Sequence, residues 1–152
     1  AGSNSNNVAH GSAALTLAKA LTVYEAFGEA DVPDDGQRYF VVSPAGWADL
    51  LQIDQFSRAE YIGEKELPYA GGMTAKRWLG FLWFSFSGLS ISSTTRDCHA
   101  WHRSSVGLAM GSDIRTEVNY IPEKVSNLIT SYMSMGAVMI DNEGAIECQI
   151  TE

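Results

Sequence analysis

The alternation of apolar and polar positions predicts one long helix near the start of the chain. From Ser12 onward apolar residues recur at helical spacing, and Ser12 can cap the first turn. The predicted buried face consists of Leu17, Ala20, Leu21, Tyr24 and Phe27. The helix is expected to end before Val32-Pro33, because proline disfavours the helical conformation in the residue before it.

A strand and a second helix are predicted next. The segment from Arg38 to Ser43, RYFVVS, is rich in β-branched and aromatic residues, which favour a strand. Ser43 can then cap a helix, and Pro44 suits its first position. The buried face of this helix is expected to consist of Trp47, Leu50 and Leu51.

The middle of the chain alternates between a long loop and several strands. Residues 52–76 contain turn-forming residues without a clear period, which is typical of a functional or interface loop. Strands are predicted at 78–86, 96–103 and 114–120, the last half exposed because apolar and polar residues alternate along it. Residues 104–110 fit a strand end or a short turn.

The last third predicts a helix followed by a hairpin. Pro122 suits a helix start and Gly136 a helix end, and several apolar residues between them share one helical face: Val125, Leu128, Ile129, Tyr132 and Met133. Two short strands, 137–140 and 145–150, would be joined by a turn at 141–144. Long helices mixed with antiparallel pairs indicate the α+β class.

Composition narrows the partners that the chain can have. Its 152 residues, 45% of them hydrophobic, suit one domain or two small lobes with a shared core. The formal net charge is −8 and no basic run occurs, which disfavours specific nucleic-acid binding. No apolar run reaches the roughly 20 residues of a membrane span. Residues 1–11 are polar and are expected to form a flexible leader.

Candidate chemistry is sparse. Cys98, His99 and His102 lie within five residues, but a structural zinc site needs four ligands, so ordinary histidines on a strand are the favoured interpretation. Cys98 and Cys148 are interpreted as small buried residues. Ser43 lacks the flanking glycines of a hydrolase nucleophile and is better explained as a helix cap. We therefore assign no catalytic, metal-binding or cofactor-binding residue and expect no cofactor.

Four segments carry a resemblance to a known family. They are VPDDGQRYFVVSPAGWADLL (32–51), KRWLGFLWFSFSGL (76–89), CHAWHRSSVGLAMGSDIRTEVNY (98–120) and MGAVMIDNEGAIECQI (135–150). In order and spacing this series resembles the major capsid proteins of tailed bacteriophages, which have the Hong-Kong-97-like shell fold. The resemblance covers nearly all of the chain after Gly11.

The resemblance implies a domain organisation. Residues 12–37 would be the spine helix of a peripheral domain, and residues 38–112 an axial domain packed around the capsomer centre. Residues 113–152 would return to the peripheral domain as strand, helix and hairpin, beside the spine helix. Because only residues 1–11 precede the helix, the family's N-terminal arm and extended two-stranded loop are expected to be absent from this chain.

The resemblance also implies a function. The chain would be a structural subunit that self-assembles into pentamers and hexamers of an icosahedral capsid enclosing the genome, formed in the host cytoplasm and present in the virion. Its partners would be other copies and other capsid or decoration proteins. Candidate contacts near the capsomer axis come from the loop at 54–75, which is equally explained as an ordinary solvated loop: Phe56, Arg58, Glu60, Tyr61, Ile62, Glu64, Lys65 and Glu66.

Two other functions stay open. The first is a small α+β enzyme that uses Cys98 with His102, which predicts an accessible and reactive thiol. The second is an accessory virion domain that binds a small ligand in a saturable pocket.

Overall fold

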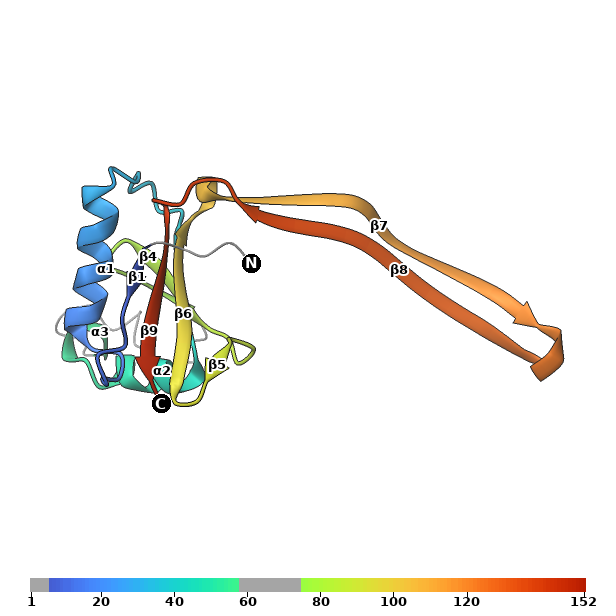
Figure 1. Cartoon of the computed structure of the whole chain (residues 1–152), viewed down its shortest axis with the longest axis horizontal. Helices are drawn as coiled ribbons and strands as arrows, with labels where there is room; N and C mark the ends of the chain where they lie inside the picture. The colour runs from blue at the N-terminus through green and yellow to red at the C-terminus, as the bar shows by residue number, and fades with distance from the viewer. Residues whose placement is uncertain (1–5, 58–74) are drawn as a thin grey trace.

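A mixed sheet forms the centre of the body, and a long hairpin projects from it (Figure 1). The computed structural model describes residues 6–57 and 75–152. Within these residues the sheet has the order β1 (Asn7–Val8), β9 (Ala145–Thr151), β6 (Thr95–His102), β2 (Arg38–Val42), β4 (Phe81–Ser85) and β3 (Ala75–Trp78), with β5 (Ile91–Ser92) paired to β6. The β1–β9 and β2–β4 pairs are parallel, and the other pairs are antiparallel.

Three helices pack against one face of this sheet. They are α1 (Leu17–Glu29), α2 (Pro44–Leu51) and α3 (Asp54–Ser57). The Ser43 hydroxyl accepts a hydrogen bond from the Gly46 amide at 3.0 Å, so the predicted cap of the second helix is confirmed. Within the described residues, no helix has both the length and the apolar character needed to cross a membrane.

The first helix differs in detail from its prediction. It begins at Leu17 with Thr16 as its cap, four residues later than expected. Its buried residues are Ala20, Val23 and Phe27, whereas Leu21 and Tyr24 are more than 40% exposed. Both sets of residues fit a helical period, and packing against the sheet selects the stripe that contains Val23.

Aromatic side chains dominate the core between helices and sheet. Phe40 and Trp83 stack with ring centroids 4.0 Å apart, and Phe27 of α1 meets Phe81 edge to face at 5.1 Å. All four side chains are fully buried. Each aromatic ring removes a large apolar area from water, so these rings anchor α1 to the sheet.

The predicted strand at 78–86 is two strands joined by a tight turn. Leu79 and Gly80 both have positive φ, 50° and 75°, which fits the turn type that favours glycine in two-residue hairpins. The turn pairs β3 with β4 and directs Trp78 and Trp83 toward each other, with centroids 5.6 Å apart. The continuous apolar run gave no sequence signal for this turn, because leucine is rare at a position with positive φ.

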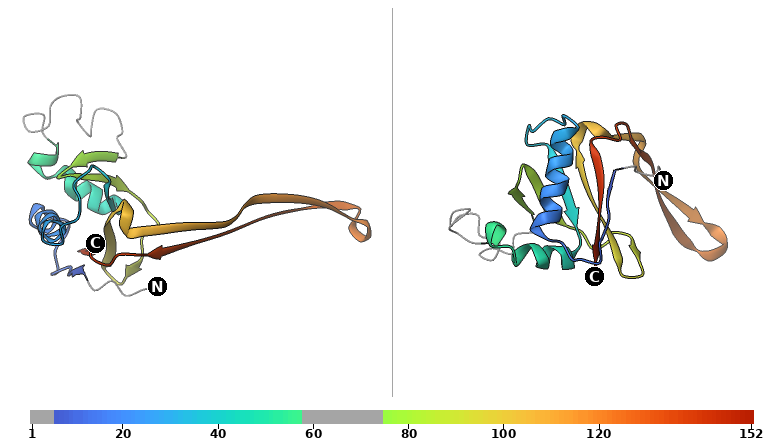
Figure 2. Two further views of the ribbon diagram at one scale, coloured as in Figure 1. Left: turned by 90° about the horizontal axis from the view of Figure 1, so that it is seen from above. Right: turned by 60° about the vertical axis from the view of Figure 1, so that its left-hand side comes forward.

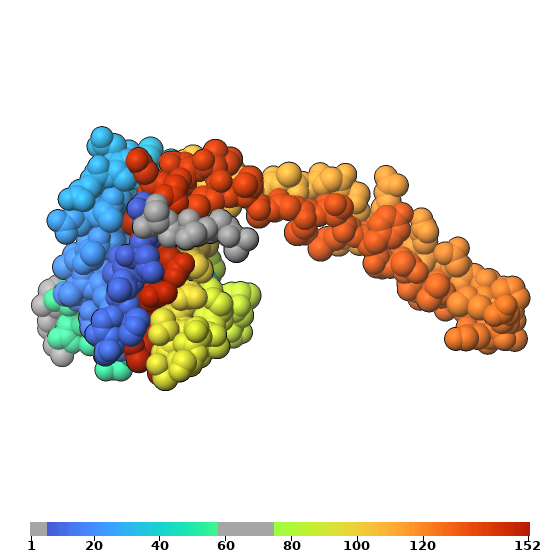
Figure 3. Space-filling view, viewed as in Figure 1, coloured from blue at the N-terminus to red at the C-terminus, as the bar shows by residue number. Residues whose placement is uncertain are grey.

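A two-stranded ribbon makes up the projecting part of the chain, which we call the β arm (residues 106–139). It consists of β7 (Val106–Ile121), a 3₁₀ turn at its tip (η3, Pro122–Lys124) and β8 (Ser126–Met139). A short 3₁₀ turn, η2 (Arg103–Ser105), joins it to β6. Figures 2 and 3 show that the arm extends away from the body for most of its length.

The β arm corrects two predictions. Residues 122–135, expected to be a helix, form η3 and most of β8, because they pair along β7 from Ile121↔Ser126 inward. The expected C-terminal hairpin is absent from the described residues, since β8 pairs with β7 while β9 pairs with β6 and β1.

The predicted leader contains a short strand. Asn7–Val8 form β1, which pairs in parallel with Glu147 and Cys148 of β9. Lys19 of α1 donates hydrogen bonds to the carbonyl oxygens of His10 and Gln149, at 2.8 and 3.1 Å. This lysine therefore ties the start of the chain and the C-terminal strand to α1, so α1 does lie beside the C-terminal strand.

Candidate assembly surface

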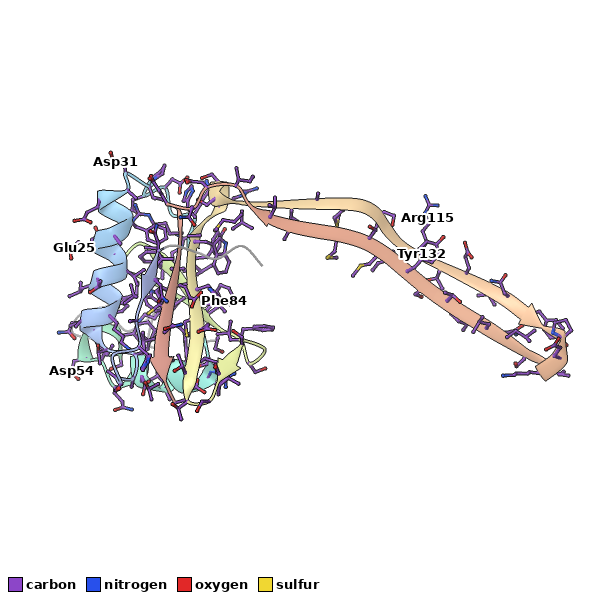
Figure 4. All side chains as sticks on the ribbon, viewed as in Figure 1. Glu25, Asp31, Asp54, Phe84, Arg115 and Tyr132 are labelled. Atoms are coloured by element: carbon purple, nitrogen blue, oxygen red, sulfur yellow. The ribbon has the colours of Figure 1, made fainter. Side chains whose placement is uncertain are left out.

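The largest exposed apolar surface of the described residues lies on the β arm. Apolar side chains project from both of its faces, as Figure 4 shows along its whole length. Those more than a third exposed are Val106, Leu108, Met110, Ile114, Val118, Tyr120, Val125, Leu128, Ile129, Tyr132, Met133, Met135 and Val138. Exposed apolar surface of this extent marks an interaction site rather than a free surface.

Cross-strand pairing concentrates this apolar surface. Val118 and Ile129 lie directly opposite each other, 64% and 67% exposed. Near the middle of the arm, the charged Arg115 lies opposite the aromatic Tyr132 (Figure 4). The part nearest the body, residues 106–112 and 133–140, contains no charged residue. A two-stranded ribbon is at best marginally stable alone in water, so the arm needs a partner surface to hold this shape.

The sequence-predicted contact residues lie elsewhere. Phe56 is fully buried in the core, where its ring meets Trp47 and Trp78 edge to face at 5.6 and 5.4 Å. The other seven candidates, Arg58, Glu60, Tyr61, Ile62, Glu64, Lys65 and Glu66, fall outside the described residues. Their role in subunit contacts stays a prediction.

The two cysteines are core residues. Cys98 and Cys148 lie opposite each other on β6 and β9, and both side chains are fully buried. Burial raises the pKa of the Cys98 thiol to about 11 and that of Cys148 to about 12. Both thiols are therefore neutral at physiological pH, and a Cys98–His102 nucleophile lacks its required accessible thiolate.

We expect neither thiol to react with iodoacetamide in the folded chain at pH 7.5, and both to react once the chain is denatured. The raised pKa values also give a sign for pH dependence. Unfolded cysteines ionise near pH 8.5, so the free energy of unfolding falls as the pH rises above that value. Mass spectrometry of alkylated peptides checks the first expectation, and urea unfolding at pH 8 and 10 checks the second. Rapid alkylation of the native chain would contradict both.

We call the place where the β arm joins the sheet its root. His102 forms hydrogen bonds at this root and does not belong to a reactive centre. Its Nδ1 accepts the Ser104 amide at 3.3 Å and so caps η2, and Ser104 Oγ lies 2.7 Å from the same nitrogen. This leaves the ring proton on Nε2, which donates to Asp35 at 3.1 Å. The carboxylate of Asp35 also accepts two hydrogen bonds from Gln37.

The hydrogen bonds around His102 join three segments where the arm leaves the sheet. The Arg103 amide donates to the Gln37 carbonyl at 3.1 Å, and the His102 amide donates to the Gly144 carbonyl at 2.9 Å. On the other strand of the arm, the Ile140 amide donates to the Ser105 carbonyl at 2.8 Å. The root is therefore held by the loop before β2 and the turn before β9.

We expect Asp35→Asn to remove the pH-dependent contribution that the hydrogen bonds of Asp35 make to the free energy of unfolding. The hydrogen bond from His102, followed by that from the Gln37 amide, lowers the pKa of the Asp35 carboxyl. Its contribution to stability is present above the unfolded pKa of about 3.9 and is lost as the pH falls through the lower folded value. Wild type is therefore expected to exceed the variant in free energy of unfolding at pH 6, and the difference is expected to shrink below pH 4.

Urea unfolding of both proteins from pH 2.5 to 6 measures that difference. Asp34→Asn, at the neighbouring position of the same turn, is the matched control. A difference between wild type and Asp35→Asn that is independent of pH would contradict the assignment.

In the described residues, no group of three or more His, Cys, Asp and Glu side chains is placed to hold a metal ion. His99 and His102 point to opposite faces of β6, because neighbouring strand residues alternate.

Comparisons with known proteins connect this architecture to viral shells. A model of the phage capsid protein family matches residues 1–152. The solved structure described as Mycobacterium phage Che8 matches with a TM-score of 0.73 at 18% identity, over 95% of this chain and 53% of that one. The capsid of cyanophage P-SCSP1u matches with a TM-score of 0.63 at 16% identity, over 97% of this chain and 53% of that one.

A virus-like particle from Pyrococcus furiosus matches with a TM-score of 0.59 at 12% identity, over 97% of this chain and 57% of that one. The chain thus spans about half the length of the solved chains it matches. A comparison with curated protein sequences finds no match. The structural likenesses confirm the α+β, Hong-Kong-97-like capsid fold. Because the family model matches the chain from end to end, the chain belongs to the phage capsid protein family.

Proposed function

We propose that this chain is a structural, non-enzymatic part of a subunit that assembles into an icosahedral phage shell around the genome. Pentamers and hexamers of the subunit would form the shell. The proposal places the chain in the virion after assembly in the host cytoplasm, with other copies and other capsid or decoration proteins as partners. The family match and the folds of the related shells support it.

The proposal rests on one observation, the exposed apolar surface of the β arm. Its apolar residues lie on both faces, and its length holds most of them away from the body (Figure 3). Packing within the described residues therefore leaves this surface in water. Contact with a neighbouring copy would bury it and would also hold the ribbon in its extended shape.

Charge supports a role in packing rather than in gripping the genome. The net charge of −8 comes from 18 acidic and 10 basic residues. A protein that neutralises many DNA phosphates needs clustered Lys and Arg, and the sequence has no such run. We therefore propose that the genome is enclosed without a specific nucleic-acid site in this chain.

The proposed division into peripheral and axial domains follows the family resemblance. In the structure, the boundary between residues 112 and 113 falls inside β7, in the middle of the arm. We propose that the arm is a third unit, the one that reaches neighbouring copies. The assignments of residues 12–37 and 38–112 stay predictions.

The double variant Val118→Thr/Ile129→Thr tests the proposal. Threonine keeps the β-branched shape, and therefore the strand, but replaces apolar with polar surface at two exposed paired positions. Burying each apolar side chain contributes about 1.5–3 kcal/mol. We expect self-association to weaken at least about tenfold, because a factor of ten corresponds to about 1.4 kcal/mol.

Sedimentation velocity of the whole chain measures the assembly, and negative-stain microscopy shows whether rings or shells form. The matched control is Thr116→Ser/Ser131→Thr, a paired polar position on the same strands, which we expect to leave assembly unchanged. A wild-type chain that stays monomeric, or a double variant that assembles as well as wild type, would refute the proposal.

A further inference from the structure

Two thiols face each other inside the sheet. Cys98 of β6 and Cys148 of β9 form the central pair of the ladder between these strands, and both are free thiols. The sequence contains no other cysteine. Both side chains are fully buried in the core cluster, so they project from the same face of the sheet. Assembly through the β arm gives this pair no role.

The hydrogen-bond pattern of the ladder fixes the distance between the two Cα atoms. The His102 amide donates to the carbonyl of Gly144, which lies opposite it, at 2.9 Å. Every second residue of β6, counted back from His102, therefore belongs to a hydrogen-bonded pair with β9, and Cys98 is one of them. Cα atoms of such a pair lie about 5.5 Å apart, and disulfides span about 4.4–6.8 Å. The backbone therefore provides the Cα distance that a disulfide needs.

The side chains come close to bonding geometry with a small strain. Burial first, and the Cys98 thiol second, raise the pKa of the Cys148 thiol to about 12, which places the two groups near each other. Cβ atoms of opposed strand residues lie about 4.5–5.5 Å apart, whereas a disulfide needs about 3.5–4.5 Å. Closing the bond therefore draws β6 and β9 together locally. The strain makes this bond easier to reduce than an unstrained disulfide.

A bond at this position would hold the strand that follows the β arm. Among the described strands, only the two-residue β1 pairs with the outer side of β9. A strand with so short a neighbour opens more readily than one in the middle of the sheet. The bond would close a loop of residues 99–147, which includes the whole arm. Closing a loop of this length restricts the unfolded chain and so favours the folded one.

We propose that Cys98 and Cys148 are a modification site, at which a disulfide closes under oxidising conditions and fastens β9 to β6. Under reducing conditions, such as those of a cytosol, the two thiols stay open. This inference goes beyond the proposed shell function and does not depend on it.

The reaction needs an oxidant of the small-molecule disulfide class, such as oxidised glutathione. The thiolate of one cysteine attacks a sulfur of the oxidant, which forms a mixed disulfide and releases one glutathione thiolate. The second cysteine thiolate attacks the protein sulfur of the mixed disulfide and releases the second glutathione thiolate. The released thiolates take up the two protons of the protein thiols, and two electrons pass from the protein to the oxidant. Because both thiols are buried and neutral in the folded chain, the reaction takes place before the sheet has formed or while β9 is open.

Refolding in a glutathione buffer tests whether the bond forms. The reduced, denatured full chain is diluted into a mixture of oxidised and reduced glutathione, trapped with N-ethylmaleimide and digested. We expect a peptide pair joined through Cys98 and Cys148, and a chain mass lower by two hydrogen atoms. A refolded chain that keeps both thiols, or that is joined to a second chain through its cysteines, would overturn the inference.

Urea unfolding of the oxidised and the reduced chain tests whether the bond fits the native sheet. We expect the oxidised chain to have a higher urea midpoint and an equilibrium constant for folding at least about tenfold greater, a modest gain for a disulfide because of the strain. Its near-ultraviolet circular dichroism is expected to match that of the reduced chain. A lower midpoint, or loss of the near-ultraviolet signal, would show that the bond traps a non-native chain and would refute the proposal.

Cys98→Ala and Cys148→Ala are the matched controls, because each keeps one thiol and cannot close the bond. We expect each variant to have the same urea midpoint in oxidising and in reducing buffer. A shift as large as that of wild type would show that glutathione acts without the cross-strand bond, contrary to the proposal. The comparison of the two wild-type forms needs no substitution, so it decides the question even if an alanine variant fails to fold.

Discussion

A chain in which residues 107–138 are replaced by an Asn-Gly turn is expected to fold but not to assemble. Val106 and Met139 face each other at the start of the arm, so a two-residue turn can connect them. The core cluster of the body contains no residue of the β arm. Removing the arm therefore removes the exposed apolar surface and leaves the packing of the body unchanged.

Two measurements test the variant that lacks residues 107–138. Thermal unfolding followed by circular dichroism is expected to show a cooperative transition within a few degrees of wild type, and sedimentation velocity a single monomeric species. Assemblies like those of the full chain would show that the body, rather than the arm, provides the contacts. Loss of the cooperative transition would show that the arm is part of the folding unit, although the core cluster of the body contains none of its residues.

Trp83→Ala is expected to have the largest effect on stability. Trp83 is fully buried, stacks on Phe40 and donates a hydrogen bond from Nε1 to the Trp78 carbonyl at 2.9 Å. Truncation of a buried tryptophan to alanine costs about 3–5 kcal/mol, of a total that is about 5–15 kcal/mol for typical proteins. We therefore expect a midpoint of urea unfolding far below that of wild type, measured by far-ultraviolet circular dichroism.

Two other variants divide this effect into its causes. Trp83→Phe keeps an aromatic ring on Phe40 but leaves the Trp78 carbonyl without its donor, so we expect a smaller loss, of about 1–3 kcal/mol. Trp101→Ala is the control on the opposite face of the sheet, where Trp101 stacks on Tyr39 and is only half buried. A cost at Trp101 equal to that at Trp83 would contradict the assignment of the core to the helix side.

The sequence predicts the body well wherever local signals agree with packing. The strand at Arg38–Val42 and the helix from Pro44 appear as expected, because β-branched residues, a serine cap and a proline at the first turn all favour the same boundaries. The strand Thr95–His102 is likewise confirmed to within one residue at each end. Each of these elements has one buried face, which gives its pattern a clear period.

The β arm was not predictable in the same way. The strand predicted at 114–120 is confirmed as part of β7, because apolar and polar residues alternate there, but β8 has no buried face and no alternation that indicates a strand. Pro122 and Gly136 imitate the start and end of a helix, yet Pro122 begins the turn at the tip and Gly136 pairs with Ala109. In β8, the adjacent β-branched residues Ile129 and Thr130 were a local signal in favour of a strand.

The same distinction, between elements with and without a buried face, applies to the candidate assembly surface. The irregular, charged sequence of the loop from Asp54 to Ala75 predicts an interface there. The structure places Phe56 of that loop in the core and exposes the apolar residues of the arm. These residues, such as Val118 and Ile129, are identified as a surface only when the partner strand is known, because in isolation they resemble core residues.

The two strands of the arm differ in length, since β7 has 16 residues and β8 has 14. The register shifts between Met110 and Ser112 and between Ser112 and Arg115 both place the extra residue in β7. At about 3.3 Å per residue, β7 follows a path about 7 Å longer between the same two ends. Because its two strands differ in length, the ribbon has to curve, with the longer strand on the outer side. The direction in which its tip points is therefore set by the number of residues in each strand.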